Sequence, residues 1–176
     1  MRQGLIIGVP LVLMAAAAVS GCGGGAEQPA PRLAWPQAWR RPPSAVLIVG
    51  DARQTGGLGS FCWVSLCADA PSLVVPTEPV AVPAGSPLVF ELGFDPTEAM
   101  VTVLRADGGK LIHELPDGTA LWEGGSQQEA VFAEAPTLGR RLQLRPDLQP
   151  GRYMVELSVR AAKGDASYGF QLEIVP

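Results

Sequence analysis

The chain has 176 residues, of which 47% are apolar and 17% charged, a balance that excludes a wholly disordered protein. Glycine and proline are abundant, with 21 and 17 residues, which argues against a largely helical fold. The formal net charge of −4 argues against a nucleic-acid-binding face, and a single histidine excludes most histidine-based active sites.

Residues 1–21 have the organisation of a removable secretory signal peptide. Arg2 supplies one positive charge, and an uncharged stretch from Leu5 to Val19 follows it. That stretch is short for a membrane span, which needs about 20 apolar residues. The alternative interpretation is an uncleaved anchor helix.

The residues that close this segment resemble a known processing motif. Val19-Ser20-Gly21-Cys22 resembles the lipobox of bacterial lipoproteins: an aliphatic residue, two small residues and a cysteine. The resemblance implies that Cys22 receives a diacylglyceryl thioether, with fatty acids such as palmitate, and becomes the mature N-terminus. Two or more acyl chains anchor a protein stably to a bilayer. The protein is therefore expected on the extracytoplasmic side of a membrane in the cell envelope; which membrane is left open.

Residues 22–44 are expected to form a tether. After Cys22 they hold three glycines and five prolines, with no hydrophobic period. Such a segment is flexible at its glycines and extended at its prolines, and its reach is on the order of 70 Å at about 3.1 Å per residue. Aromatic and basic side chains interrupt the pattern, and they could rest either at a lipid headgroup interface or against the domain: Trp35, Trp39, Arg40 and Arg41.

From residue 45 the pattern changes to short apolar runs separated by turn residues, which is typical of an all-β sandwich or barrel. The segment 45–49 is continuously apolar. Apolar residues alternate with other residues in 88–94, 142–144, 153–160 and 168–174. We therefore predict antiparallel β-strands throughout this part of the chain.

Turn residues predict how some strands are joined. Asp107-Gly108-Gly109 is expected to link a strand at 101–103 to one at 111–115 as a hairpin. Pro116-Asp117-Gly118 is a second turn. Lys163-Gly164-Asp165 separates the two clearest strands, which are expected to pair with each other.

The segment Gln149-Pro150-Gly151-Arg152-Tyr153 resembles the start of a late strand in immunoglobulin-like and fibronectin-like sandwiches. In those folds a tyrosine near the strand start hydrogen-bonds back to the preceding turn, the tyrosine corner, which implies that role for Tyr153. We therefore predict an immunoglobulin-like antiparallel β-sandwich over residues 77–176. Residues 45–76 would form an N-terminal extension carrying two cysteines.

If Cys22 is lipidated, two of the three cysteines remain. Cys62 and Cys67 are then free to form a disulfide in an oxidising compartment. The bridge would close a small loop that holds Trp63 and Val64. The loop is either a structural staple that pins Trp63 onto the sandwich or an exposed recognition loop. A redox or metal-binding pair is a further alternative, although the spacing is not Cys-x-x-Cys.

Two blocks in the domain are similar to a group of secreted or lipid-anchored bacterial proteins without assigned function. They are Gly59-Ser60-Phe61-Cys62-Trp63 with Cys67-Ala68-Asp69, and Gly164-Asp165-Ala166-Ser167-Tyr168-Gly169-Phe170. Phe61 stands where tyrosine is usual in the group. The resemblance supports the layout of the domain and implies no chemistry.

No motif in the sequence assembles an active site. His113 lies in a predicted strand, the Gly-x-Ser-x-Gly elbow does not occur, and the carboxylates fall mostly in turns. Gly56-Gly57-Leu58-Gly59 lacks the lysine and hydroxyl residue of a phosphate-binding loop. We therefore expect no catalytic, metal or cofactor site. The hypothesis is a lipid-anchored, non-catalytic binding or envelope-structural module with an envelope protein or glycan as partner; the alternative is an extracytoplasmic hydrolase.

Overall fold

The computed structural model describes residues 40–124, 126–127 and 139–176, and within these ranges all regular structure is β-strand. The expected signal peptide, the lipidation site Cys22 and most of the tether lie outside the described residues. The strands in chain order are β1 (Ala45–Val49), β2 (Ala52–Thr55), β3 (Gly57–Trp63), β4 (Leu66–Ala68), β5 (Leu73–Pro76), β6 (Val80–Pro83), β7 (Leu88–Leu92), β8 (Pro96–Arg105), β9 (Lys110–Glu114), β10 (Thr119–Glu123), β11 (Ser126–Gln127), β12 (Arg141–Leu144), β13 (Gly151–Ala161) and β14 (Gly164–Val175).

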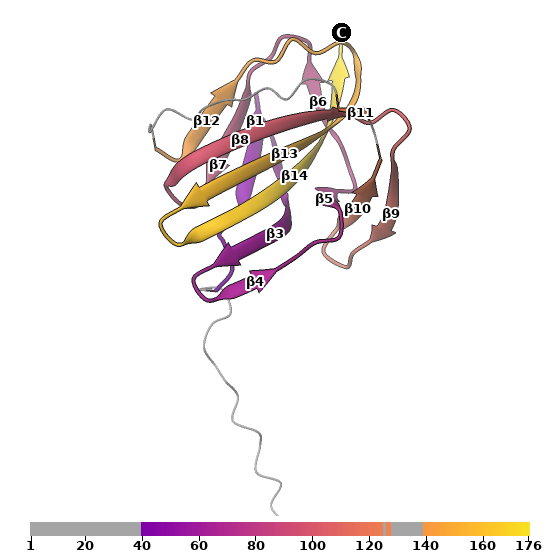
Figure 1. Cartoon of the computed structure of the whole chain (residues 1–176). Helices are drawn as coiled ribbons and strands as arrows, with labels where there is room; N and C mark the ends of the chain where they lie inside the picture. Colours follow the sequence, from indigo (N-terminus) through magenta and orange to yellow (C-terminus); the bar gives the residue numbers. More distant parts are fainter. Residues whose placement is uncertain (1–39, 125, 128–138) are drawn as a thin grey trace, which may run out of the picture. The chain divides into compact units, whose positions relative to one another are not determined.

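Two sheets pack face to face and enclose the main core, as Figure 1 shows. The smaller sheet has the order β12-β7-β1-β2, and the larger has β11-β8-β13-β14-β3-β4 with β6 pairing in parallel with β14. Their inner faces meet at the rings of Phe90 and Phe170, whose centroids are 5.2 Å apart in an edge-to-face arrangement. The all-β sandwich predicted from the alternating strands is therefore confirmed.

The pairing of the later strands follows the immunoglobulin order. β7 pairs with β12 in one sheet, and β13 lies between β8 and β14 in the other, like strand B with E and strand F between C and G. The Tyr153 hydroxyl, near the start of β13, donates a hydrogen bond of 2.9 Å to the Gln149 carbonyl, as a tyrosine corner requires. Of the expected N-terminal extension 45–76, β1 to β4 are built into this sandwich, because β1 pairs with β2 and β7, and β3 pairs with β4 and β14. β5 belongs to a third sheet.

One predicted hairpin is wrong. The turn at Asp107-Gly108-Gly109 exists, but the strand before it and the strand after it do not pair with each other. β8 pairs instead with β13, which buries Val101 and Val103 in the main core. The chain then crosses to a different sheet, where β9 pairs with β10 across the predicted turn at Pro116-Asp117-Gly118. The predicted hairpin of β13 and β14 is confirmed.

A third sheet, with the order β5-β10-β9, covers part of the outer face of the large sheet. It lies at the right of Figure 1. Its residues Val75 and Trp122 pack on Met154, which points away from the main core. Two facing glycines, Gly57 on β3 and Gly169 on β14, allow β5 to come close to the large sheet. This layer explains why Met154 is buried although strand alternation predicts an outward position for it.

Candidate functional site

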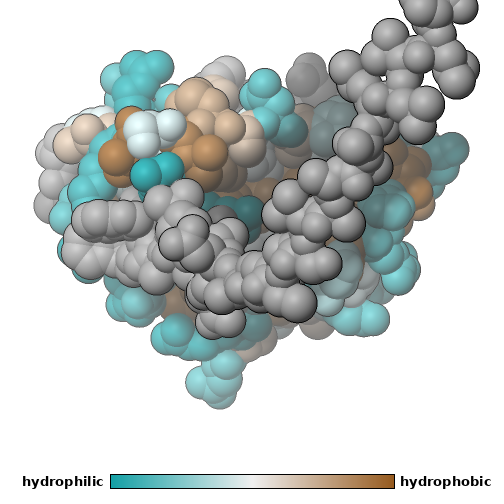
Figure 2. Space-filling view, turned by 90° about the horizontal axis from the view of Figure 1, so that it is seen from below, coloured by the Kyte–Doolittle hydropathy of each residue, from teal (hydrophilic) through white to brown (hydrophobic). Residues whose placement is uncertain are grey.

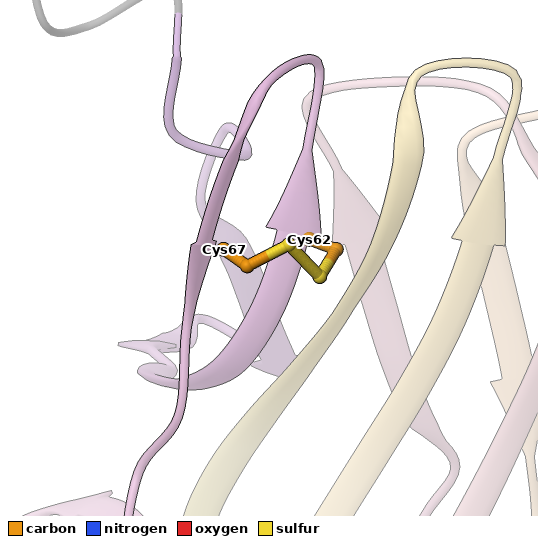
Figure 3. The surroundings of a disulfide bond; sticks show 2 residues. All are labelled: Cys62 and Cys67. Atoms are coloured by element: carbon orange, nitrogen blue, oxygen red, sulfur yellow. A yellow bond between two sulfur atoms is a disulfide. The ribbon is translucent and has the colours of Figure 1, made fainter.

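The predicted cysteine loop is the β3–β4 hairpin. Trp63 pairs with Leu66 across a turn of two residues, and Cys62 lies directly opposite Cys67. The two cysteines form a disulfide with their Cα atoms 4.0 Å apart, which confirms the predicted bridge (Figure 3). Both cysteines are exposed, so the disulfide ties the two strands together on the outer face of the large sheet.

Trp63 is not an exposed recognition residue, which corrects one of the two interpretations of this loop. Only 3% of its surface is accessible, and its ring packs against that of Phe94 with centroids 4.9 Å apart. Successive side chains of a strand point to opposite faces, so Trp63 points inward while the neighbouring Cys62 faces outward. The hairpin therefore pins Trp63 to the sandwich, and of the two proposed recognition residues only Val64 faces solvent.

Val64 has an unusual backbone conformation at the tip of the hairpin. Its φ is 56°, a region that a β-branched residue rarely adopts and that costs about 1–3 kcal/mol. Its N–H donates a hydrogen bond of 2.7 Å to the Lys163 carbonyl in the β13–β14 turn, which holds the two turns together. The Val64 side chain is 65% exposed, and Leu66 beside it is 37% exposed. The hydrogen bond to Lys163 therefore holds an apolar tip in solvent despite the strain.

The chain segment before β1 is fixed at the same end of the sandwich. The Tyr168 hydroxyl donates a hydrogen bond of 2.5 Å to the Pro43 carbonyl, and the Gly93 N–H donates one of 3.2 Å to the Ser44 carbonyl. Gly93 allows this approach, because a Cβ at that position would lie 2.6 Å from Pro43. These contacts place Arg41 beside the two turns.

A hollow of about 590 Å³ lies between these elements. Its apolar lining includes Trp63 and Phe94, and its charged lining consists of three cations and one carboxylate: Arg41, Arg140, Lys163 and Asp95. Arg140 forms an ion pair of 3.2 Å with Asp95. Figure 2 views the protein from this end, where hydrophobic and hydrophilic surfaces lie side by side. The arrangement is suited to an anionic group attached to an apolar body.

A second, larger hollow of about 680 Å³ lies on the outer face of the large sheet. Its floor carries small hydroxyl side chains, and Glu98 and Arg160 form an ion pair of 3.0 Å at its side. The Ser167 hydroxyl donates to the Ser60 carbonyl at 3.3 Å, and the Ser60 hydroxyl accepts from the Ala70 N–H at 3.0 Å. These hydroxyls are engaged with the backbone and have no imidazole beside them.

The remaining candidate groups are dispersed. His113 lies on the exposed edge strand β9, and it does not line either hollow. The described residues include no group of three or more histidine, cysteine or acidic side chains able to hold a metal ion. They also include no apolar helix long enough to span a membrane. The structure thus brings together the hairpin tip, the β13–β14 turn and the start of the domain, and this end is the strongest candidate site.

Sequence reasoning missed most of the hollow between the turns. Arg41 stood out beside the tryptophans of the tether, and Trp63 stood out beside the cysteines. Phe94, Arg140 and Lys163 come from three other turns, and no local pattern links them. The pairing of β3 with β14, the pairing of β12 with β7 and the fixing of residues 43–44 bring these segments to one place.

No protein-family model matches the chain, and a search of curated proteins finds no similar sequence.

The burial of the Tyr168 hydroxyl predicts a pH dependence of stability. Burial raises the pKa of the Tyr168 hydroxyl above its ordinary value of 10.0. The folded protein therefore keeps this tyrosine neutral when the unfolded chain begins to ionise it. Its contribution to stability is present below about pH 10 and is lost as the pH rises above that value, by up to about 1.4 kcal/mol per pH unit.

We expect Tyr168→Phe to lower the free energy of unfolding at pH 8 by about 1 kcal/mol and to reduce the further loss between pH 9 and pH 11. Denaturant titrations at several pH values measure both effects. An equal alkaline loss in the wild type and in Tyr168→Phe would show that this hydroxyl is not the group responsible.

Proposed function

We propose that this protein is a lipid-anchored extracytoplasmic β-sandwich that acts as a non-catalytic binding or envelope-structural module. The observation that carries the proposal is that two of the three cysteines form a disulfide with each other. Cys62 and Cys67 are joined to each other, which leaves Cys22, the cysteine of the lipobox-like segment, as the one outside the bridge. A disulfide is also consistent with an oxidising compartment outside the cytoplasm.

Three further features support this function. The Gly- and Pro-rich segment after Cys22 is long enough to hold a domain away from a lipid surface. The β3–β4 hairpin is cross-linked and presents an apolar tip, as a rigid binding element would. The Ser60 and Ser167 hydroxyls in the larger hollow bond to the backbone, which favours binding or structural roles over hydrolysis.

The lipid anchor is tested by the variant Cys22→Ser. We expect the wild-type protein to incorporate labelled palmitate and to sediment with membranes, and Cys22→Ser to do neither. The matched control is the double variant Cys62→Ser/Cys67→Ser, which loses the disulfide but keeps the lipidation site. Unchanged membrane retention of Cys22→Ser would contradict lipid anchoring.

The disulfide and the modification of Cys22 are tested together by counting free thiols. The mature protein, unfolded without reductant, should contain no free thiol, and reduction should release two. Two free thiols before reduction would exclude the bridge, whereas one would exclude the modification of Cys22. Mass spectrometry of the N-terminal peptide identifies the attached group directly.

A further inference from the structure

We propose that the end of the sandwich formed by the hairpin tip and the cationic hollow binds the surface of an anionic phospholipid membrane. This inference rests on the proposed lipid anchor, because it assigns the face that the anchored domain turns toward the bilayer. The face consists of the β3–β4 tip, the β13–β14 turn, the segment 40–44 and the hollow lined by Arg41, Arg140 and Lys163.

Charge is the first argument. The whole chain has a net charge of −4, yet the hollow is lined by three cations and one carboxylate. Asp95, the carboxylate, is already in an ion pair with Arg140. Among the described residues, Arg41 and Lys163 form no ion pair, and the exposed Arg40 adds a further cation next to Arg41. The exposed Asp165 after the β13–β14 turn adds a second carboxylate, so this end carries four cations against two carboxylates. A local excess of positive charge on an acidic protein is complementary to phosphate headgroups.

Apolar exposure is the second argument. Val64 and Leu66 are two of the few large apolar side chains that the domain leaves exposed, and both lie in the same hairpin. The positive φ of Val64 and its hydrogen bond to Lys163 fix the tip next to a cation. Aliphatic side chains flanked by basic ones are the combination that enters the headgroup region of a bilayer.

The position of the anchor is the third argument. Residues 23–39 separate Cys22 from the first described residue, and they span on the order of 50 Å when extended. The bonds from Tyr168 to Pro43 and from Gly93 to Ser44 fix the start of the domain at the cationic end. An anchored domain is therefore linked to the membrane at the end that carries the complementary charge. Tethering raises the effective concentration of the surface, so that a weak contact suffices.

The experiment uses the lipidated full-length mature protein bound to two kinds of vesicle. One kind is pure phosphatidylcholine, and the other contains phosphatidylglycerol in addition. Hydrogen exchange followed by mass spectrometry measures protection of each segment. We expect anionic vesicles to slow exchange in residues 62–67 and 161–165, relative to phosphatidylcholine vesicles, with no change in β9.

Two variants with the same change in charge separate this face from general electrostatic attraction. Arg41→Ser/Lys163→Ser removes two cations from the face, and Arg53→Ser/Lys110→Ser removes two exposed cations elsewhere. The first should weaken the docking equilibrium roughly 25-fold, since each basic residue near an anionic surface contributes about a fivefold factor, and the second should change it little. Val64→Thr, which keeps the branched shape, should also weaken it.

Equal protection in both kinds of vesicle, or equal effects of the two charge variants, would overturn the proposed docking face. Attachment through the lipid anchor is measured separately, by flotation with phosphatidylcholine vesicles. A protein that floats with these vesicles but shows no charge-dependent protection is anchored and does not dock. A protein that fails to float with them, but is protected at this face by anionic vesicles, docks without the proposed anchor.

Discussion

Replacing Trp63 by alanine is expected to lower the free energy of unfolding by about 3–5 kcal/mol. The side chain is almost completely buried and packs on Phe94 at the end of the main core that lies next to the β3–β4 turn. Truncation leaves a cavity beside the hollow that Arg41 and Lys163 line, and the rigid hairpin cannot collapse to fill it. Chemical denaturation followed by circular dichroism measures the loss. A fall of this size is a large fraction of the about 5–15 kcal/mol by which native proteins are stable.

The matched control is Val64→Ala, in the same loop. Val64 is exposed, so its truncation should change the free energy of unfolding by less than about 1 kcal/mol. A large effect of Trp63→Ala with a small effect of Val64→Ala assigns the tryptophan to stability and leaves the tip for binding. Equal, small effects would contradict the observed packing of Trp63. Trp63→Phe should recover part of the loss, because a phenyl ring can still contact Phe94.

The sandwich was predictable where strand alternation and burial agree. Tyr168, Phe170, Leu172 and Ile174 alternate in β14, and all four lie in the main core. One face of this strand packs against a second sheet, so the period of two is directly visible in the sequence. The disulfide was also predictable, because assigning Cys22 to the expected lipidation site leaves two cysteines to pair.

The third sheet was not predictable, because it buries residues that alternation assigns to solvent. Gln171 and Met154 lie on the outer face of the large sheet, yet both are buried. β9 and β10 are both short. The turn at 107–109, which precedes β9, is equally compatible with pairing β8 to β9. Local turn chemistry determines where the chain reverses, but it does not determine which strand becomes the partner. That choice depends on long-range packing, here of Trp122 on Met154.

The two glycines beneath β5 have a packing role that the sequence pattern does not indicate. Gly57 and Gly169 are partners across β3 and β14, and both face the Val74 carbonyl. Glycine lacks a Cβ, so the pair forms a notch in the large sheet that admits the backbone of β5. A single sequence shows a glycine without showing which backbone approaches it.

Gly169→Ala is therefore expected to lower the free energy of unfolding by about 2–4 kcal/mol, at or above the usual range for overpacking. Its Cβ would lie 2.2 Å from the Val74 carbonyl oxygen and 2.9 Å from a methyl of Val75. The clash is with backbone, which cannot rotate away, so β5 must move off β14. The cluster of Val75, Trp122 and Met154 would open with it. Chemical denaturation measures the stability, and hydrogen exchange in residues 73–76 reports the displacement.

A double-mutant cycle with Gly57→Ala tests the shared notch. A Cβ at Gly57 would lie 2.5 Å from the same Val74 oxygen, so the two substitutions force the same movement of β5. Once β5 has moved for one of them, the second should cost less, and the double variant should lose clearly less than the sum. Gly139→Ala is the control, because its Cβ meets open space and only its φ of 77° opposes the change, at about 1 kcal/mol. Additive losses at Gly57 and Gly169 would contradict a common contact. They would show that the close approach of β5 to the large sheet does not depend on this pair of glycines.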